Sequence, residues 1–204
     1  MKRTLSLCAA VLLFALPSLA QVVSYPSGPE GSVGFGVGTL VAPGSNSASG
    51  DHQPQTVGGG TYLNVSGDVI VHRNFGISGE VAWRASQNSY QGYQGFRPIL
   101  YDFNAMYAPK LGKRARLELV AGLGGISSRF YNDYYTCDYY TCTNYSDSNH
   151  FMGDVGAGVR LYVTEHVFLR PEFRTYFIND AWEYSSNHAT RAGVTLGYSF
   201  GGHE

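Results

Sequence analysis

The sequence predicts an all-β protein, an eight-stranded antiparallel up-and-down β-barrel that spans a membrane. Charged residues make up only 14% of the 204 residues, well below the share of about 25% in soluble domains. Apolar and polar residues alternate in eight segments, and no segment after the N-terminal region is apolar for long enough to form a membrane helix. A chain with the composition of a membrane protein but without such a helix fits a closed barrel, because an unpaired strand edge is unfavourable in lipid.

The first residues have the layout of a cleavable secretory signal. Lys2 and Arg3 precede an apolar run that ends at Leu16, and small residues follow at positions 18 and 20. An uncleaved anchor is the alternative, but the run is shorter than the about 20 residues that a membrane helix needs. We expect the signal, with Cys8, to be removed. The chain then divides into a signal peptide (1–20), a short periplasmic segment (21–31), the barrel (32–200) and a C-terminal tail (201–204).

Eight segments alternate with period two, as half-buried strands do. In one of them Leu169 and Phe173 alternate with Arg170, Glu172 and Arg174. The predicted strands lie near residues 32–41, 63–71, 75–84, 99–108, 116–128, 151–163, 167–178 and 189–200.

The connections between these strands are short and long in turn. The short ones are 72–74, 109–115 and 164–166, and the long ones are 42–56, 87–98, 129–150 and 179–188. Outer-membrane barrels have short periplasmic turns and long extracellular loops. This sorting therefore predicts that both termini lie in the periplasm.

The polar face of the strands separates a membrane barrel from a soluble one, since lipocalin-type barrels also have eight alternating strands. No lysine lies in a predicted strand, and the polar face is mostly Gly, Ser and Thr with a balanced set of acids and arginines. An unpaired charge in a filled lumen costs several kcal/mol, so we expect these charges to pair inside the barrel, with Glu172 diagonal to Arg160. The predicted lumen network is Asp68, Glu80, Arg84, Asp102, Arg116, Glu118, Asp154, Arg160, Arg170, Glu172, Arg174 and Arg191.

Aromatic residues on the apolar face gather toward both ends of the predicted strands. Such girdles mark the two membrane interfaces of outer-membrane barrels. Near the short turns they are Phe75, Tyr107, Tyr198 and Phe200, and near the long loops Trp83, Tyr101 and Phe177.

The last three predicted strands carry literal motifs. Residues 193–200 read GVTLGYSF, and residues 153–163, GDVGAGVRLYV, are followed by FLRPEFR at 168–174. They resemble the C-terminal aromatic strand and the penultimate hairpin of small opacity-type and OmpA-like outer-membrane barrels. The resemblance implies an outer-membrane location and recognition by the barrel-assembly machinery. Four residues follow the terminal aromatic, and no peptidoglycan-binding domain is expected after the barrel.

A tandem repeat, DYYTC at 133–137 and again at 138–142, distinguishes the longest predicted loop. Cys137 and Cys142 are the only cysteines left after signal removal, and the loop should face an oxidising exterior. We therefore predict a disulfide between them. A metal site is the alternative, but no second cysteine or histidine pair lies nearby, and we expect neither metal nor cofactor.

The same loop is rich in tyrosine among small polar residues. Such a composition is typical of recognition surfaces, where rigid rings give contact area at low entropic cost, and contact with lipopolysaccharide is the alternative. The tyrosines are Tyr131, Tyr134, Tyr135, Tyr139, Tyr140 and Tyr145.

The sequence predicts a non-enzymatic protein with a structural or surface-interaction role through its long loops. The expected partners are outer-membrane lipid, lipopolysaccharide and an extracellular ligand. A net charge of −1 gives no reason to expect nucleic acid. A narrow channel is an alternative, although open pores need about 16 strands. A lipid A-modifying enzyme is another: His188 and Thr190 lie close to Ser185 and Ser186, but no acid is placed beside them.

Overall fold

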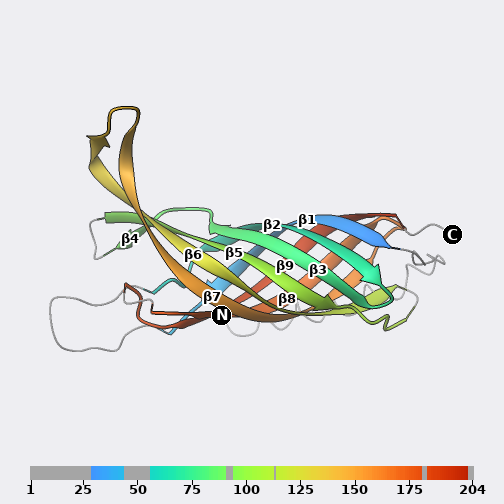
Figure 1. Ribbon diagram of the computed structural model, residues 1–204. Helices are drawn as coiled ribbons and strands as arrows, with labels where there is room; N and C mark the ends of the chain where they lie inside the picture. Colours follow the sequence, from blue (N-terminus) through green and yellow to red (C-terminus); the bar gives the residue numbers. More distant parts are fainter. Residues whose placement is uncertain (1–28, 44–55, 91–93, 113, 181–182, 202–204) are drawn as a thin grey trace, which may run out of the picture.

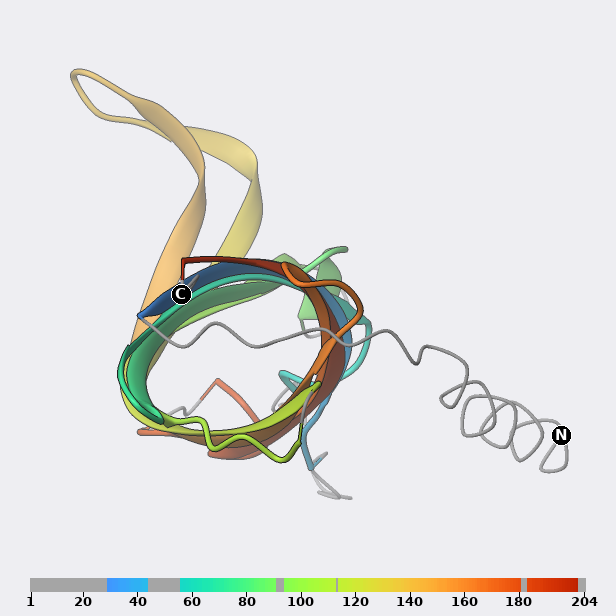
Figure 2. The ribbon, with the colours of Figure 1, turned by 90° about the vertical axis from the view of Figure 1, so that its right-hand side faces the viewer.

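The computed structural model describes residues 29–43, 56–90, 94–112, 114–180 and 183–201. The predicted signal peptide, most of the predicted periplasmic segment and residues 202–204 of the tail lie outside this part. The described strands form a closed antiparallel ring, seen along its axis in Figure 2. None of the described residues forms a helix long and apolar enough to span a membrane.

Eight strands make the wall of the barrel, as the sequence predicts. β1 pairs with both β2 and β9, and β3 pairs with both β2 and β5, so that the ring closes. β4 is a three-residue strand that pairs with the beginning of β5 alone. The strands are β1 (Glu30–Val41), β2 (Thr61–His72), β3 (Phe75–Arg84), β4 (Asn88–Tyr90), β5 (Gln94–Tyr107), β6 (Ala115–Cys137), β7 (Cys142–Tyr162), β8 (Val167–Ile178) and β9 (His188–Phe200).

The largest difference from the predicted strands is the β6–β7 hairpin. Residues 129–150 were expected to form a loop, but the two strands continue past the barrel and rise from its end as a ribbon (Figure 1). Tyr131 pairs with Tyr145, and after an irregularity Thr136 pairs with Thr143. Tyrosine and threonine favour extended structure, so this polar segment is strand rather than loop.

The two ends of the barrel differ, and we call them the turn rim and the loop rim. At the turn rim, β2 and β3 join through a turn in which Arg73 has a φ of 51°, and the Thr164 hydroxyl oxygen accepts the backbone N–H of Val167 at 3.0 Å. β1 begins and β9 ends at this rim, where Gly31 pairs with Phe200. The long connections and the β6–β7 hairpin lie at the loop rim.

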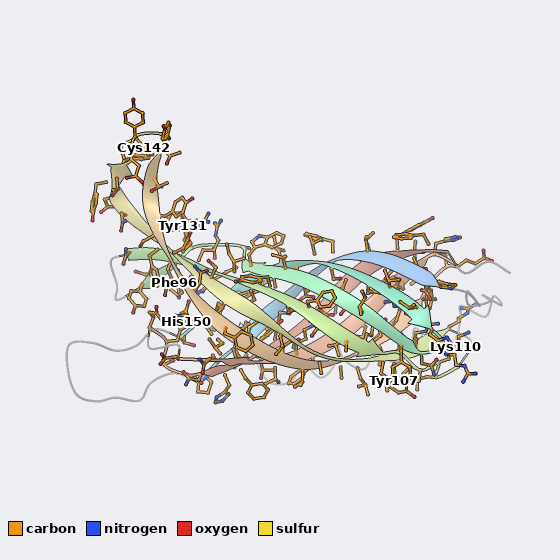
Figure 3. All side chains as sticks on the ribbon, in the orientation of Figure 1. Phe96, Tyr107, Lys110, Tyr131, Cys142 and His150 are labelled. Carbon is orange, nitrogen blue, oxygen red and sulfur yellow. A yellow bond between two sulfur atoms is a disulfide. The ribbon has the colours of Figure 1, made fainter. Side chains whose placement is uncertain are left out.

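The outward face of the wall is apolar on every strand of the ring. Phe103 is 63% exposed and Phe173 is 55% exposed, values that a water-facing surface rarely shows over so wide an area. The side chains stand outward around the whole wall in Figure 3, with Tyr107 near the turn rim. This face matches the apolar band of a transmembrane barrel.

Candidate functional site

All twelve predicted lumen charges point inward, and ten of them form ion pairs with one another. Arg116 pairs instead with Glu30, which was not in the predicted set. Arg84 is buried at the loop-rim end of β3, close to Gly60, and its Nε and Nη1 have no hydrogen-bond partner in the described part of the chain. No carboxylate of the described residues pairs with it, so the observed ion-pair network, unlike the predicted one, does not include this arginine.

The ion pairs nearest the turn rim centre on Arg160. Its guanidinium contacts Asp68 at 2.6 Å, Glu30 at 3.2 Å and also Glu118. Glu30, which also binds Arg116 at 2.8 Å, was expected in the periplasmic segment, but β1 begins two residues earlier than predicted. Period-two spacing from the inward-facing Ser32 is the sequence signal that could have placed Glu30 in the lumen.

The remaining ion pairs lie toward the middle of the lumen. Arg174 contacts Asp102 at 3.1 Å and Asp154 at 3.5 Å, and Arg191 contacts Glu80 at 2.5 Å. Glu172 joins the two groups of charges, because it binds both Arg170 at 3.0 Å and Arg191 at 2.8 Å.

Glu172 does not bind Arg160, although the predicted register holds. Gly158 lies opposite Glu172, which puts Arg160 on the diagonal. Arg160 instead reaches across the lumen to β1 and β2, and sideways to Glu118 of the neighbouring strand β6. The interaction across the barrel is preferred because a fully buried guanidinium needs several acceptors at once.

Small residues make room for these long side chains. At Gly197 a Cβ atom would collide with the Phe168 ring, and that ring packs 4.2 Å from the Arg160 guanidinium. The hollow between the two groups of charges, bounded by Arg170, Glu172 and Arg174 among others, has a volume of only about 10 Å³. That is room for about one water molecule, so this part of the charged lumen is closely packed.

An apolar cluster, the lumen plug, fills the half of the lumen near the loop rim. This corrects the prediction that the inward face is polar throughout. The Tyr62 hydroxyl donates to the carbonyl of Val57 at 2.6 Å, Tyr184 is hydrogen-bonded to Ser128, and burial raises the pKa of Tyr184 well above its usual range. The plug comprises Leu40, Val57, Tyr62, Phe96, Leu100, Ile126, Phe130, Met152, Tyr176, Ile178, Tyr184 and Ala189.

A polar latch holds the β8–β9 connection over the plug. The Glu183 carboxylate accepts hydrogen bonds from Ser148 and lies 2.7 Å from Nε2 of His150. An open hollow of about 410 Å³, lined by residues that include Tyr90, Ser148 and Glu183, lies beside it. The sequence analysis missed this group because the residues are 35 positions apart.

The latch does not have the geometry of a nucleophilic triad. In such a triad the carboxylate holds one imidazole nitrogen and the hydroxyl faces the other. Here Ser148 at 3.3 Å and Glu183 at 2.7 Å approach the same nitrogen, Nε2 of His150. The group therefore fastens the connection to β7.

In the described part of the chain, the side chain of His188, the histidine considered for an enzyme site, has a hydroxyl as its partner. Its Nδ1 lies 3.1 Å from the Ser186 hydroxyl, while Ser185 donates to the carbonyl of Pro43 at 2.7 Å. Thr190 contacts Thr175 at 3.3 Å. No carboxylate of the described residues forms an ion pair with His188. Glu183, which lies on the same connection, binds His150 instead.

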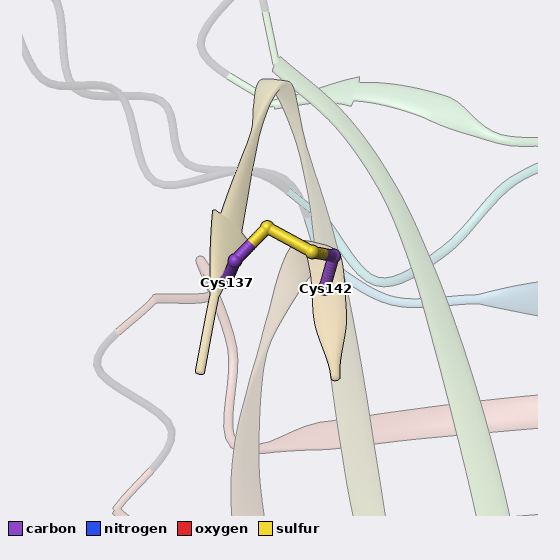
Figure 4. Close-up of a disulfide and its surroundings, with 2 residues drawn as sticks. All are labelled: Cys137 and Cys142. Carbon is purple, nitrogen blue, oxygen red and sulfur yellow. A yellow bond between two sulfur atoms is a disulfide. The ribbon is translucent and has the colours of Figure 1, made fainter. Parts of the chain in front are cut away.

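The β6–β7 hairpin ends in the disulfide between Cys137 and Cys142, drawn in Figure 4. Beyond the two cysteines only four residues turn the chain. Tyr139 is 92% exposed and Tyr140 is 89% exposed, and their rings meet edge to face at 4.9 Å.

The other predicted loop tyrosines occupy two levels of the hairpin. Tyr134 and Tyr135 are exposed on the ribbon. Tyr131 and Tyr145 pair with each other where the ribbon leaves the barrel, and both are half-buried. Figure 3 shows this point at the label of Tyr131, well below Cys142.

Comparisons with known proteins agree with this architecture. Residues 6–200 match the family model of the outer membrane protein beta-barrel domain, and among curated proteins no sequence matches the chain. A major outer membrane protein of Thermus thermophilus has a similar fold, with a TM-score of 0.57 at 10% identity over 84% of this chain and 99% of its own.

Two further solved structures are similar. Ail of Yersinia pestis, solved with the heparin analogue sucrose octasulfate, has a TM-score of 0.54 at 13% identity over 85% of this chain and 99% of its own. The N-terminal barrel of Pseudomonas aeruginosa OprF has a TM-score of 0.53 at 14% identity over 85% and 98%. With the family match over most of its length, this chain belongs to the outer membrane protein beta-barrel domain family and is a bacterial outer-membrane barrel.

Proposed function

We propose that this protein is a non-enzymatic surface-recognition protein whose barrel anchors a rigid tyrosine-bearing hairpin outside the cell. Long loops of outer-membrane barrels face the exterior, which places the β6–β7 hairpin there. The observation that carries the proposal is the exposure of Tyr139 and Tyr140, 92% and 89%, at the tip of a disulfide-closed ribbon. Large rings held open to solvent on a rigid support provide contact area at low entropic cost.

The charge of the hairpin narrows the class of partner. Residues 130–150, which form the hairpin beyond Arg129, contain three aspartates and no lysine or arginine. Ail was solved with the heparin analogue sucrose octasulfate, but residues 130–150, the part of the hairpin beyond Arg129, have no lysine or arginine to bind a polyanion. A neutral glycan or a basic protein surface is the partner that this composition favours.

The filled lumen supports a scaffold rather than a channel. The charged half has room for about one water molecule, and the plug residues near the loop rim are almost fully buried. The latch and the partners of His188 likewise provide no relay for acyl transfer, which favours recognition over lipid modification.

Binding to glycan and protein arrays tests the proposal. The full-length mature protein in nanodiscs is compared with a variant in which Tyr134, Tyr135, Tyr139 and Tyr140 are replaced by serine and the disulfide is kept. A matched control replaces Tyr107, at the opposite rim, by serine. We expect wild type and control to bind the same neutral or basic array members and the hairpin variant to lose them. Equal binding by the hairpin variant, or silence of the wild type on both arrays, contradicts the proposal.

A further inference from the structure

Two arginines lie side by side on the outward face of the barrel near the loop rim. Arg97 of β5 is the register partner of Arg129 of β6. Their neighbours along the strands, Phe96 and Ser128, are buried inside, so the alternation of a strand turns both arginines outward. No other arginine or lysine of the described strands points outward. Like charges directly opposite each other destabilise a sheet, so this pair calls for a counter-charge.

Only one carboxylate shares the row. Asp147 of β7 lies opposite Arg129 and binds its Nε at 3.0 Å, with the two side chains about one-third exposed. The Tyr145 ring packs 4.1 Å from the same guanidinium. Arg97 has no ion pair among the described residues, and its Nε is buried without a hydrogen-bond partner. The row therefore has a net charge of +1, and the Nε of Arg97 has no partner among the described residues.

The rows nearer the turn rim become aromatic and apolar. The next row holds Ser127 and Asn149 together with Ile99 and Trp83, the one below holds Tyr101 and Phe151, and Phe103 and Leu123 follow. Successive rows on one face are about 6.6 Å apart along a strand. Aromatic girdles mark the membrane interface, so the arginine row lies just outside the girdle, at the level of lipid headgroups.

We propose that Arg97 and Arg129 together bind the phosphate of a phosphorylated glycolipid in the outer leaflet, the lipid A part of lipopolysaccharide. Planar guanidinium groups bind phosphate through paired N–H···O contacts. Asp147 and Tyr145 fix the Arg129 guanidinium on the outward face, and Arg97 supplies a guanidinium that no carboxylate of the described residues neutralises. The hydroxyl of Ser127 and the amide of Asn149 lie one row below, where sugar and acyl carbonyl groups of such a lipid would lie. This site is independent of the recognition role proposed for the tyrosines.

Native mass spectrometry of the folded mature protein in detergent tests the site. The probes are bis-phosphorylated lipid A, dephosphorylated lipid A and inorganic pyrophosphate. The variants are Arg97→Gln with Arg129→Gln, and Arg97→Gln alone, which leaves the Arg129–Asp147 pair intact. The matched control removes two exposed cations at the opposite rim, by Arg73→Gln with Lys110→Gln. Folding of each variant is checked by the mobility of unboiled protein on a detergent gel.

We expect the wild type and the control to retain bis-phosphorylated lipid A. The double variant should bind it at least about tenfold more weakly. The Arg97→Gln variant should show a smaller loss in the same direction. Equal retention of dephosphorylated lipid A, or retention by both arginine variants equal to the control, would overturn the site. Displacement of lipid A by pyrophosphate at equal concentration would assign the arginines to a free anion instead of a lipid.

Discussion

Several buried arginines of the lumen take carboxylate partners from strands far apart in the sequence. Arg160 of β7 binds Glu30 of β1 and Asp68 of β2, so each ion pair also holds opposite walls of the barrel together. The period-two pattern predicts which charges face inward, because that depends on the strand alone. It does not predict the partners, because these depend on which side chains meet across the closed ring.

Replacing Glu172 by alanine tests this network, since Glu172 is the acid that joins its two groups. The free energy of unfolding should fall by about 3 kcal/mol, near the low end for breaking a buried pair, because Arg170 and Arg191 each keep another carboxylate. Urea titration in lipid vesicles provides the measurement, with Glu165→Ala in the exposed turn as the control. A loss no larger than that of the control would show that Glu172 contributes nothing to the pairing.

At the scale of elements, the barrel strands follow from the sequence and the hairpin does not. Strands that face lipid on one side and the lumen on the other alternate strictly, which gives a clear signal. The ribbon beyond the rim, from Tyr131 to Tyr145, has water on both sides, so nothing imposes alternation on it. The latch between His150 and Glu183 was likewise hidden, because it depends on how the β8–β9 connection folds over the plug.

The disulfide should matter to the hairpin and not to the barrel. The change Cys137→Ser with Cys142→Ser should leave insertion and gel mobility unchanged, because the bond lies beyond the rim. Closing so small a ring stabilises it by about 2 kcal/mol on the chain-entropy estimate. External protease should therefore cut the ribbon of intact cells at least about tenfold faster in the variant. Failure of the variant to insert would assign the hairpin a role in folding, and an unchanged rate of cutting would show that the disulfide does not restrain it.

At the scale of the whole molecule, the barrel has its charges inside and its apolar side chains outside. The charged network and the lumen plug together fill the interior, and the outward face is apolar between the two rims. Composition alone predicts this arrangement, which is the reverse of that in a soluble protein. The chain has too few charges and too few lysines to cover a water-facing surface. The plug was not predicted, because inward apolar residues near the loop rim are indistinguishable in sequence from loop residues that cover a rim.

Spin labels placed along β9 test most directly whether this barrel faces lipid outward and is filled inside. Single cysteines for labelling replace Ala192, Val194, Leu196 and Tyr198 on the outward face, and Thr195 and Ser199, which are 0% and 1% exposed, on the inward face. In lipid vesicles the outward labels should collide often with oxygen and rarely with a water-soluble nickel chelate. The inward labels should collide rarely with both, because neither lipid nor bulk water reaches a filled lumen. High nickel accessibility at positions 195 and 199 would reveal an open aqueous pore, and high nickel accessibility at the outward positions would contradict the lipid-facing wall.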